Sequence, residues 1–277
     1  MESRRERRSL YVAATAVCAA AYAVSAYATS YIESPWGIGQ FRPAVVIPAF
    51  FAIVFGPWVG GVGAALGTFV QSIARYGHPW LTLVSGTPAN FLAFYLMGRL
   101  LHEKFSWVRF VAVSVVLLVA ANFVCALGVL AYYLLVGVFP LTLPAQFYLG
   151  FSIGLTLWWY ITMLPFMLLV TPVLLRACAR AMPGLMPGGV LHAALKQAVP
   201  SKLFAAVLTL SGLGMVLVGL VAFLPGAEVL VVAYESLVGP EYATIVLNGI
   251  RTMFLLTGGS CAVVGLVLRI LAQYYKA

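Results

Sequence analysis

The stretch Gly37–Gly67, GIGQFRPAVVIPAFFAIVFGPWVGGVGAALG, predicts two membrane helices joined by a tight turn. Its single charged residue is Arg42, and no residue from Pro43 to Gly67 carries a charge. The dipeptide at Gly56 and Pro57 predicts a tight turn between a short helix over 43–55 and a longer helix over 58–75. An uncharged stretch of this length indicates a segment that lies in a lipid bilayer.

The whole chain has the composition of an integral membrane protein. Of its 277 residues, 63% are hydrophobic and 8% are charged, and its mean hydropathy is +1.04. A soluble domain carries about 25% charged residues. Apolar runs that can cross about 30 Å of hydrocarbon as a helix recur, whereas the short alternating segments of a membrane β-barrel do not. We therefore predict an all-α integral membrane protein that crosses the cell membrane several times.

Charge predicts the topology of the helices. Eight helices are expected, over 9–30, 43–55, 58–75, 82–102, 107–137, 146–179, 202–224 and 245–273, with a kink or an early end in the sixth at Pro165 or Pro172. With the N-terminus in the cytoplasm, all of the 16 basic residues except Arg42, Arg75 and Arg251 face inward, as the positive-inside rule requires. Both termini are thus expected in the cytoplasm, and the first helix is expected to be a retained anchor rather than a cleaved signal peptide.

A Gly- and Pro-rich segment divides the chain. The sequence of residues 180–201 is RAMPGLMPGGVLHAALKQAVPS, which is polar for this protein. We predict a six-helix transmembrane bundle over 1–179, a cytoplasmic linker over 180–201, and two additional transmembrane helices in a C-terminal extension over 202–277. The alternative for 180–201 is a short interfacial helix.

The sequence offers no catalytic motif. His78, His102 and His192 all lie in predicted loops, and the four cysteines are scattered singly, so neither a metal site nor a disulfide framework is expected. No Asp or Glu lies within a predicted span, which argues against a proton relay. The net charge of +9 follows the topology and does not indicate nucleic acid. We expect no enzyme activity, no catalytic residue, no metal and no cofactor.

Polar and aromatic side chains gather on the predicted outer side. The first loop and the segment after the third helix supply the candidate substrate-binding residues Trp36, Gln40, Arg42, Trp80 and Asn90. Aromatic rings stack on flat ligands, amides bind polar edges, and arginine pairs with an anion or a carbonyl. These residue types favour a small polar ligand with a flat ring. The alternative for Arg42 is an anchor on membrane lipid headgroups, and tryptophan gathers at membrane interfaces in any case.

Two asparagines lie inside predicted spans, where an unpaired amide is costly. Asn90 is interpreted as a ligand contact. Asn122 meets the same argument, although a hydrogen bond between helices is the commoner role of such a residue.

Two predicted helices carry faces of small residues. In the first helix, Ala16, Ala20 and Ala23 belong to a surface that has more small residues than one neighbour requires, so a partner subunit is expected to dock there. In the third helix, the glycines at 56, 60, 63 and 67 are expected to serve packing within the chain.

The opening stretch, followed by GTPANFLAFYLMGRLL at 86–101, resembles the substrate-binding (S) components of energy-coupling-factor (ECF) vitamin transporters. The similarity covers roughly residues 8–178 and is closest to the queuosine-precursor branch, through GQFRP. That branch usually has an acidic residue shortly after the arginine, whereas Ala44, Val45 and Val46 follow here. Helices seven and eight have no counterpart in the usual unit.

The resemblance implies a six-helix bundle that binds one vitamin or nucleobase-like micronutrient near its outer face. It also implies that Ala16, Ala20 and Ala23 contact a transmembrane coupling subunit, which partner ATPase subunits drive. The resulting expectation is the substrate-capture subunit of an ATP-driven uptake transporter. The alternative is a membrane sensing or scaffold module for an unknown ligand.

Overall fold

The structure is a computed structural model that describes residues 2–31, 33–34, 38–224 and 240–274. These residues form two compact units: unit 1 comprises residues 1–32 and 40–197, and unit 2 comprises residues 33–39 and 198–277. The helices are α1 (Glu2–Thr29), η1 (Pro43–Val45), α2 (Val46–Phe55), α3 (Pro57–Tyr76), α4 (Trp80–Val84), α5 (Gly86–Leu101), α6 (Trp107–Leu135), α7 (Ala145–Ala181), η2 (Pro183–Leu185), α8 (Gly188–Lys196), α9 (Ser201–Val221) and α11 (Pro240–Tyr274).

Four helices in the described part of the chain are long and apolar enough to cross a membrane. They are Arg8–Thr29, Trp107–Leu135, Phe147–Ala181 and Lys202–Val221, and two shorter apolar helices cover Pro43–Phe55 and Phe254–Ile270. The prediction of an all-α, multi-pass membrane protein is therefore confirmed. The arrangement of six plus two spans and the cytoplasmic location of both termini stay predictions.

The turn between α2 and α3 forms at Gly56. Its φ of +96° is a backbone conformation that glycine adopts without strain. Pro57 follows as the first residue of α3, where a missing N–H costs nothing. The sequence thus predicted this turn correctly.

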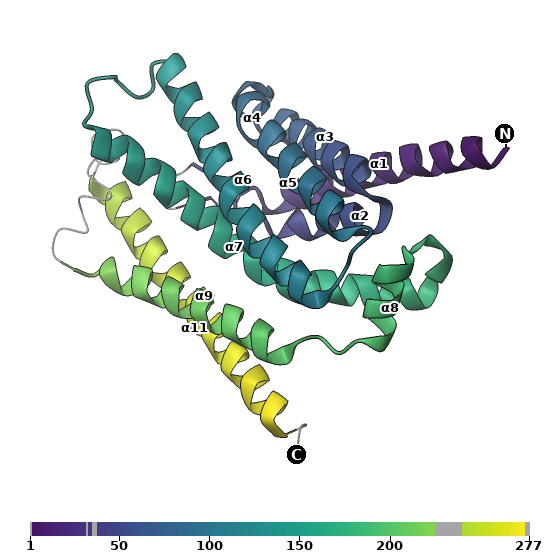
Figure 1. The fold of residues 1–277 in the computed structure, drawn as a ribbon. Helices are drawn as coiled ribbons and strands as arrows, with labels where there is room; N and C mark the ends of the chain where they lie inside the picture. The colour runs from purple at the N-terminus through teal and green to yellow at the C-terminus, as the bar shows by residue number, and fades with distance from the viewer. Residues whose placement is uncertain (1, 32, 35–37, 225–239, 275–277) are drawn as a thin grey trace. The chain divides into compact units, whose positions relative to one another are not determined.

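Glycines on α3 let its backbone approach α1 and α2 closely. A methyl group at Gly63 would lie 2.6 Å from Cys18 Sγ, and one at Gly60 would overlap Ala52. The face of α3 predicted for packing within the chain is confirmed, because α1 and α2 occupy it (Figure 1).

Two predicted helices differ in the structure. The segment expected as one helix over 82–102 divides at Ser85 into α4 and α5. The hydroxyl of Ser85 donates to Leu81 O at 2.6 Å, and a methyl at Gly128 of α6 would lie 2.7 Å from Ser85 Cα, so the break lies against a neighbouring helix. By contrast, α7 does not end at either internal proline and runs over 37 residues.

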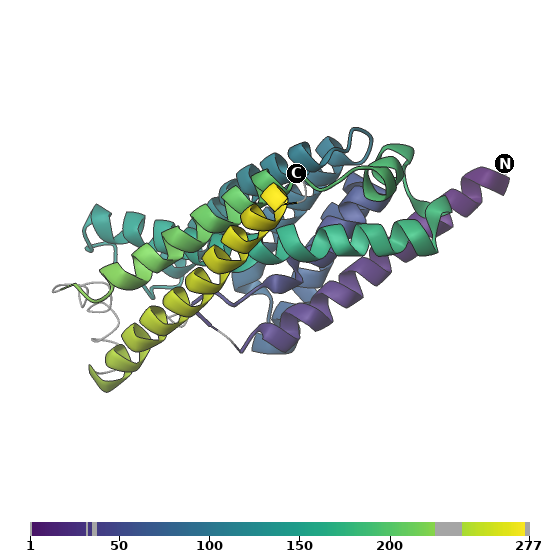
Figure 2. The same cartoon turned by 90° about the horizontal axis from the view of Figure 1, so that it is seen from below.

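Helix α8 packs against other helices of unit 1. Val190, Ala193 and Ala194 are buried, and the indole of Trp107 donates to Ala193 O at 3.1 Å. Arg176 also donates to Gln197 O at 3.3 Å. Much of the segment predicted as a linker is therefore part of the bundle (Figure 2).

Unit 2 contains an antiparallel pair, α9 and α11, within the predicted C-terminal extension. Their contact is close, since a methyl at Gly212 would lie 2.6 Å from Gly258 O. Arg251 of α11 donates through Nε to Ala222 O at 3.0 Å and lies over the Phe223 ring at 4.4 Å. Arg251 thereby satisfies a carbonyl at the end of α9.

Candidate functional site

Two glutamines and an arginine form a closed hydrogen-bond network in unit 1, called the amide cluster below. Arg42 Nη2 donates to Gln40 Oε1 at 3.0 Å and to Gln71 Oε1 at 3.1 Å, while Gln71 Nε2 donates to Gln40 Oε1 at 3.2 Å. Gln40 Nε2 donates in turn to the hydroxyl of Tyr76 at 2.6 Å. The two predicted residues Gln40 and Arg42 are therefore brought together.

Local structure fixes the position of the arginine. Arg42 directly precedes η1, where Pro43 begins a short helical turn, so its backbone is tied to the start of α2. Gln40 and Gln71 are only 3% and 0% exposed, whereas Arg42 is half-buried. The N–H groups of Arg42 other than Nη2 have no partner among the described residues and are not fully buried. The two amides orient a guanidinium that still has donors for a carbonyl or an anion.

Sequence reasoning missed Gln71. Gln71 is an amide inside an apolar helix. The argument applied to Asn90, that an unpaired amide in a span is costly, identifies Gln71 equally well. Tyr76, at the end of α3, was expected among the polar and aromatic residues of the outer side but was not chosen as a candidate; its contact with Gln40, 36 positions away in the sequence, comes from the fold.

Asn90 belongs to a second polar contact. Its Nδ2 donates to Thr68 Oγ1 at 2.8 Å and lies 3.5 Å from the hydroxyl of Tyr22. Thr68 precedes Gln71 by three residues on α3, so both polar groups lie on the same face of that helix. The carbonyl oxygen of Asn90 has no partner among the described residues and is not fully buried, so it can accept a hydrogen bond from a ligand.

Of the two predicted tryptophans, the structure describes only Trp80, which does not belong to the amide cluster. Trp80 begins α4 and is 60% exposed. Trp36 lies outside the described residues.

Aromatic rings hold the end of α1 near the end of α3. The guanidinium of Arg75 lies 4.3 Å from the centre of the Tyr31 ring, and the hydroxyls of Tyr27 and Tyr31 are 2.8 Å apart. Cation–π contacts at exposed sites contribute about 0.5–1 kcal/mol. This contact lies beside the amide cluster, because Arg75 precedes Tyr76 in the chain.

Several buried donors of α5, α6 and α7 have no hydrogen-bond partner among the described residues. They include Thr87 Oγ1, Asn122 Nδ2, Ser152 Oγ and Trp159 Nε1. Each unmet buried donor costs about 1–3 kcal/mol of folding free energy. Such groups are uncommon in native proteins, and they gather here on three helices of one bundle.

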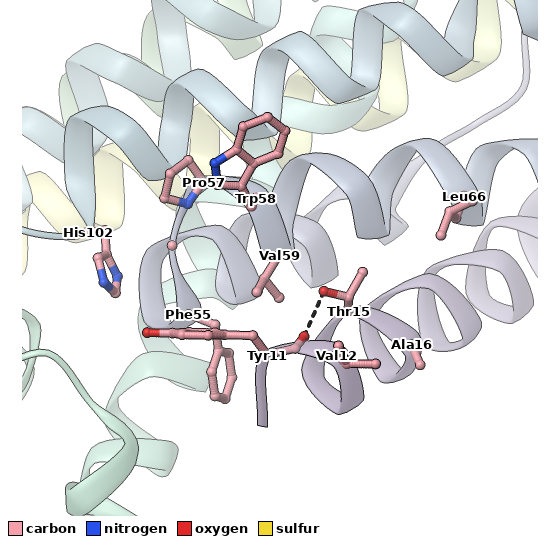
Figure 3. Close-up of a pocket in the computed structure, with 11 residues that line it drawn as sticks. Tyr11, Val12, Thr15, Ala16, Phe55, Pro57, Trp58, Val59, Leu66 and His102 are labelled. Carbon is pink, nitrogen blue, oxygen red and sulfur yellow. Dashed lines mark hydrogen bonds between the residues drawn. The ribbon is translucent and has the colours of Figure 1, made fainter. Parts of the chain in front are cut away.

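A separate apolar cavity of about 570 Å³ lies along α1 (Figure 3). Val12 and Ala16 of α1 line it, as do Trp58 and Leu66 of α3 and His102. The hydroxyl of Thr15 in this cavity already donates to Tyr11 O at 2.8 Å, as the dashed line in Figure 3 shows. The cavity includes none of the predicted substrate-binding residues, and its walls suit an apolar group rather than a polar ligand.

The predicted docking alanines differ in exposure. Ala16 and Ala20 are exposed, whereas Ala23 is 6% exposed. The face of α1 that is open to a partner therefore contains Ala16 and Ala20, while Ala23 packs within unit 1.

Neither a metal nor a thiol centre is formed by the described residues. They contain no group of three or more His, Cys, Asp or Glu side chains that could hold a metal ion, and all four cysteines are unpaired. The polar groups near Arg42 suit binding rather than bond-making chemistry.

Comparison with known proteins gives one positive result. Residues 8–163, more than half of the chain, match the family model of the ECF-type riboflavin transporter, S component. No curated protein and no solved structure gives a match. The matched range covers α1 to the first half of α7 and thus includes the amide cluster, Asn90 and the α1 cavity. The chain is a membrane-embedded substrate-binding subunit of an ECF transporter and belongs to the family of ECF-type riboflavin transporter S components.

Proposed function

We propose that this S component captures riboflavin, or a similar planar micronutrient, from the outer side of the cell membrane. The observation that carries the proposal is the amide cluster, in which Gln40 and Gln71 hold a half-buried Arg42 with free donors. A flavin ring presents carbonyl oxygens and ring nitrogens that accept hydrogen bonds, so its chemistry fits the donors of Arg42. The family's printed name supports the same ligand.

A second ligand is favoured by one sequence observation. The GQFRP motif at 39–43 resembles the queuosine-precursor branch of S components, and both Gln40 and Arg42 of this motif belong to the amide cluster. A purine-like precursor also presents a carbonyl and ring nitrogens. The acidic residue that this branch usually places after the arginine has no counterpart at positions 44–46, and we therefore place riboflavin first.

The ligand proposal is tested on purified full-length protein. Native mass spectrometry identifies any small molecule that purifies with the chain, and quenching of riboflavin fluorescence measures its dissociation constant. A queuosine precursor is titrated in competition with riboflavin. Saturable riboflavin binding supports the proposal. If the protein binds the queuosine precursor but not riboflavin, the precursor replaces riboflavin as the proposed ligand. If it binds neither compound, the proposed capture function is contradicted.

We further propose that the partner subunits supply the energy for uptake. The exposed alanines Ala16 and Ala20 and the apolar cavity beside Ala16 form a surface on which a helix of a membrane coupling subunit fits closely. ATPase subunits would act through that coupling subunit. This surface lies on α1 and α3, whereas the amide cluster is formed by the 40–42 segment and the last turns of α3, so docking and binding use different residues.

Larger side chains at Ala16 and Ala20 are expected to separate uptake from binding. Ala16→Leu with Ala20→Leu should reduce uptake by cells containing the coupling and ATPase subunits at least tenfold, because leucine holds the partner helix away from α1. The affinity of the purified protein for riboflavin should stay within twofold of wild type. The control is Ala112→Leu with Ala120→Leu, two exposed alanines of α6. Equal uptake by the docking variant and this control would show that the α1 face is not the docking surface.

A further inference from the structure

Two buried hydrogen-bond donors without a partner among the described residues lie on the neighbouring helices α6 and α7. Asn122 is 6% exposed and Trp159 is 7% exposed, and both Asn122 Nδ2 and Trp159 Nε1 lack an acceptor in the described part of the chain. Figure 1 shows α6 and α7 side by side. The predicted interhelical hydrogen bond of Asn122 is not formed by this amide nitrogen. Buried donors of this kind are satisfied by an acceptor from a ligand or from an ordered water.

Asn122 lies at about the same depth in the bundle as Asn90. The backbone contact between Gly128 and Ser85 sets the register of α6 against α5. Asn90 lies five residues after Ser85 on α5, and Asn122 lies six residues before Gly128 on α6. Because a helix rises about 1.5 Å per residue, the two asparagines lie about 8 Å and about 9 Å from the contact, in the same direction.

The two asparagines also lie on facing sides of their helices. A methyl at Gly86 would lie 4.0 Å from Cys125 Sγ, so these two positions face each other across α5 and α6. Asn90 follows Gly86 by four residues and Asn122 precedes Cys125 by three, and residues at these spacings share one face of a helix.

Trp159 lies on the face of α7 that meets the loop of Arg42. Phe166 of α7 contacts Phe41 edge to face, with the ring centres 5.5 Å apart, and Phe41 is the residue between Gln40 and Arg42. Trp159 precedes Phe166 by about two helical turns, which places both rings on one side of α7. Trp159 is therefore on the side of α7 that faces the loop of the amide cluster.

Acidic residues are missing from this part of the sequence. No acidic residue occurs from 104 to 227, and Glu33 is the single one between 7 and 102. The buried atoms without a partner, Asn122 Nδ2 and Trp159 Nε1, are donors, as are the N–H groups of Arg42. A ligand with a full positive charge would have to be desolvated here without a carboxylate from any span to pair with it.

We propose that Asn122 and Trp159 form an inner donor pair, which binds the carbonyl oxygens or ring nitrogens of a planar ligand that is uncharged or anionic. This inference rests on the proposed function and adds the chemical class of the ligand: it is rich in acceptors and carries no positive charge. The inner donor pair selects the ligand through its acceptor edge, while Arg42 binds it from the loop.

The test combines ligand affinity with the stability of the ligand-free protein. The variants are Asn122→Leu and Trp159→Phe, which remove the donors while keeping apolar bulk. The matched control is Asn248→Leu, which removes an exposed amide of unit 2. Each of the two variants should bind riboflavin at least tenfold more weakly than wild type, and the control should bind within twofold. The melting temperature of each ligand-free variant should equal or exceed that of wild type, because an unmet buried donor has been removed.

The outcomes separate this inference from the proposed function. If the wild-type protein binds no riboflavin, the proposed function is contradicted. The inner donor pair, which rests on that function, is then contradicted too. If wild type binds riboflavin and both variants bind it equally tightly, the inner donor pair alone is overturned. A lowered melting temperature of the two variants would then show that an ordered water satisfies the two donors. Binding of the cationic vitamin thiamine as tightly as riboflavin would overturn the proposed ligand class.

Discussion

Arg42→Ala is expected to weaken riboflavin binding by about 10- to 100-fold. A hydrogen bond to a charged group contributes about 1.5–3 kcal/mol, and Arg42 is the one charge in the amide cluster. The fold should survive, because Gln71 still donates to Gln40 at 3.2 Å after the guanidinium is removed. Fluorescence titration gives the affinity, and size-exclusion chromatography together with the melting temperature reports the folded state.

Two further variants make the Arg42 result specific. Arg42→Lys keeps the charge and loses the forked geometry, so it should recover only part of the affinity. Arg99→Ala removes an exposed arginine from the last turn of α5 and should leave binding unchanged. If Arg42→Ala binds as tightly as Arg99→Ala, Arg42 is an anchor on lipid headgroups, as the alternative interpretation of the sequence has it.

Gly60→Leu is expected to abolish the folded protein. A methyl at this position already overlaps the side chain of Ala52 and lies 2.6 Å from its Cα, which belongs to the backbone of α2. Overpacking against a side chain costs about 1–3 kcal/mol, and a clash with backbone exceeds that range because no rotamer change relieves it. Gly60→Ala should therefore lower the melting temperature, and Gly60→Leu should leave little monodisperse protein.

A second glycine provides the control. Gly150, inside α7, has no heavy atom within 4 Å of an added methyl. Because alanine is favoured over glycine within a helix by about 0.5–1 kcal/mol, Gly150→Ala should equal or exceed the wild-type melting temperature. Similar behaviour of Gly60→Ala and Gly150→Ala would show that α2 and α3 do not approach each other as described.

The parts of the fold that local sequence determines were predicted well. Gly56 and Pro57 specify a turn by their backbone preferences alone, and apolar composition specifies membrane helices without knowledge of their neighbours. The break at Ser85 was missed because it depends on the approach of Gly128, which lies in another helix. The packing of α8 was missed for the same reason, since Trp107 holds it from a distant part of the chain.

The candidate site was predicted in part. Gln40 and Arg42 were predicted because they lie two positions apart at the edge of an apolar run, where a charge is conspicuous. Gln71 was overlooked, although the cost of an unpaired amide inside a span applies to it as it does to Asn90; its hydrogen bond to Arg42 depends on the fold. Asn122 was interpreted as a helix–helix contact, which is the average fate of such a residue; only the described neighbours show that its nitrogen has no acceptor.

The amide cluster has a consequence for the conditions under which the protein works. Amide side chains do not ionise. Gln40 and Gln71 therefore accept their hydrogen bonds from Arg42 without gaining or losing a proton. The two amides thus need no particular external acidity to orient the arginine.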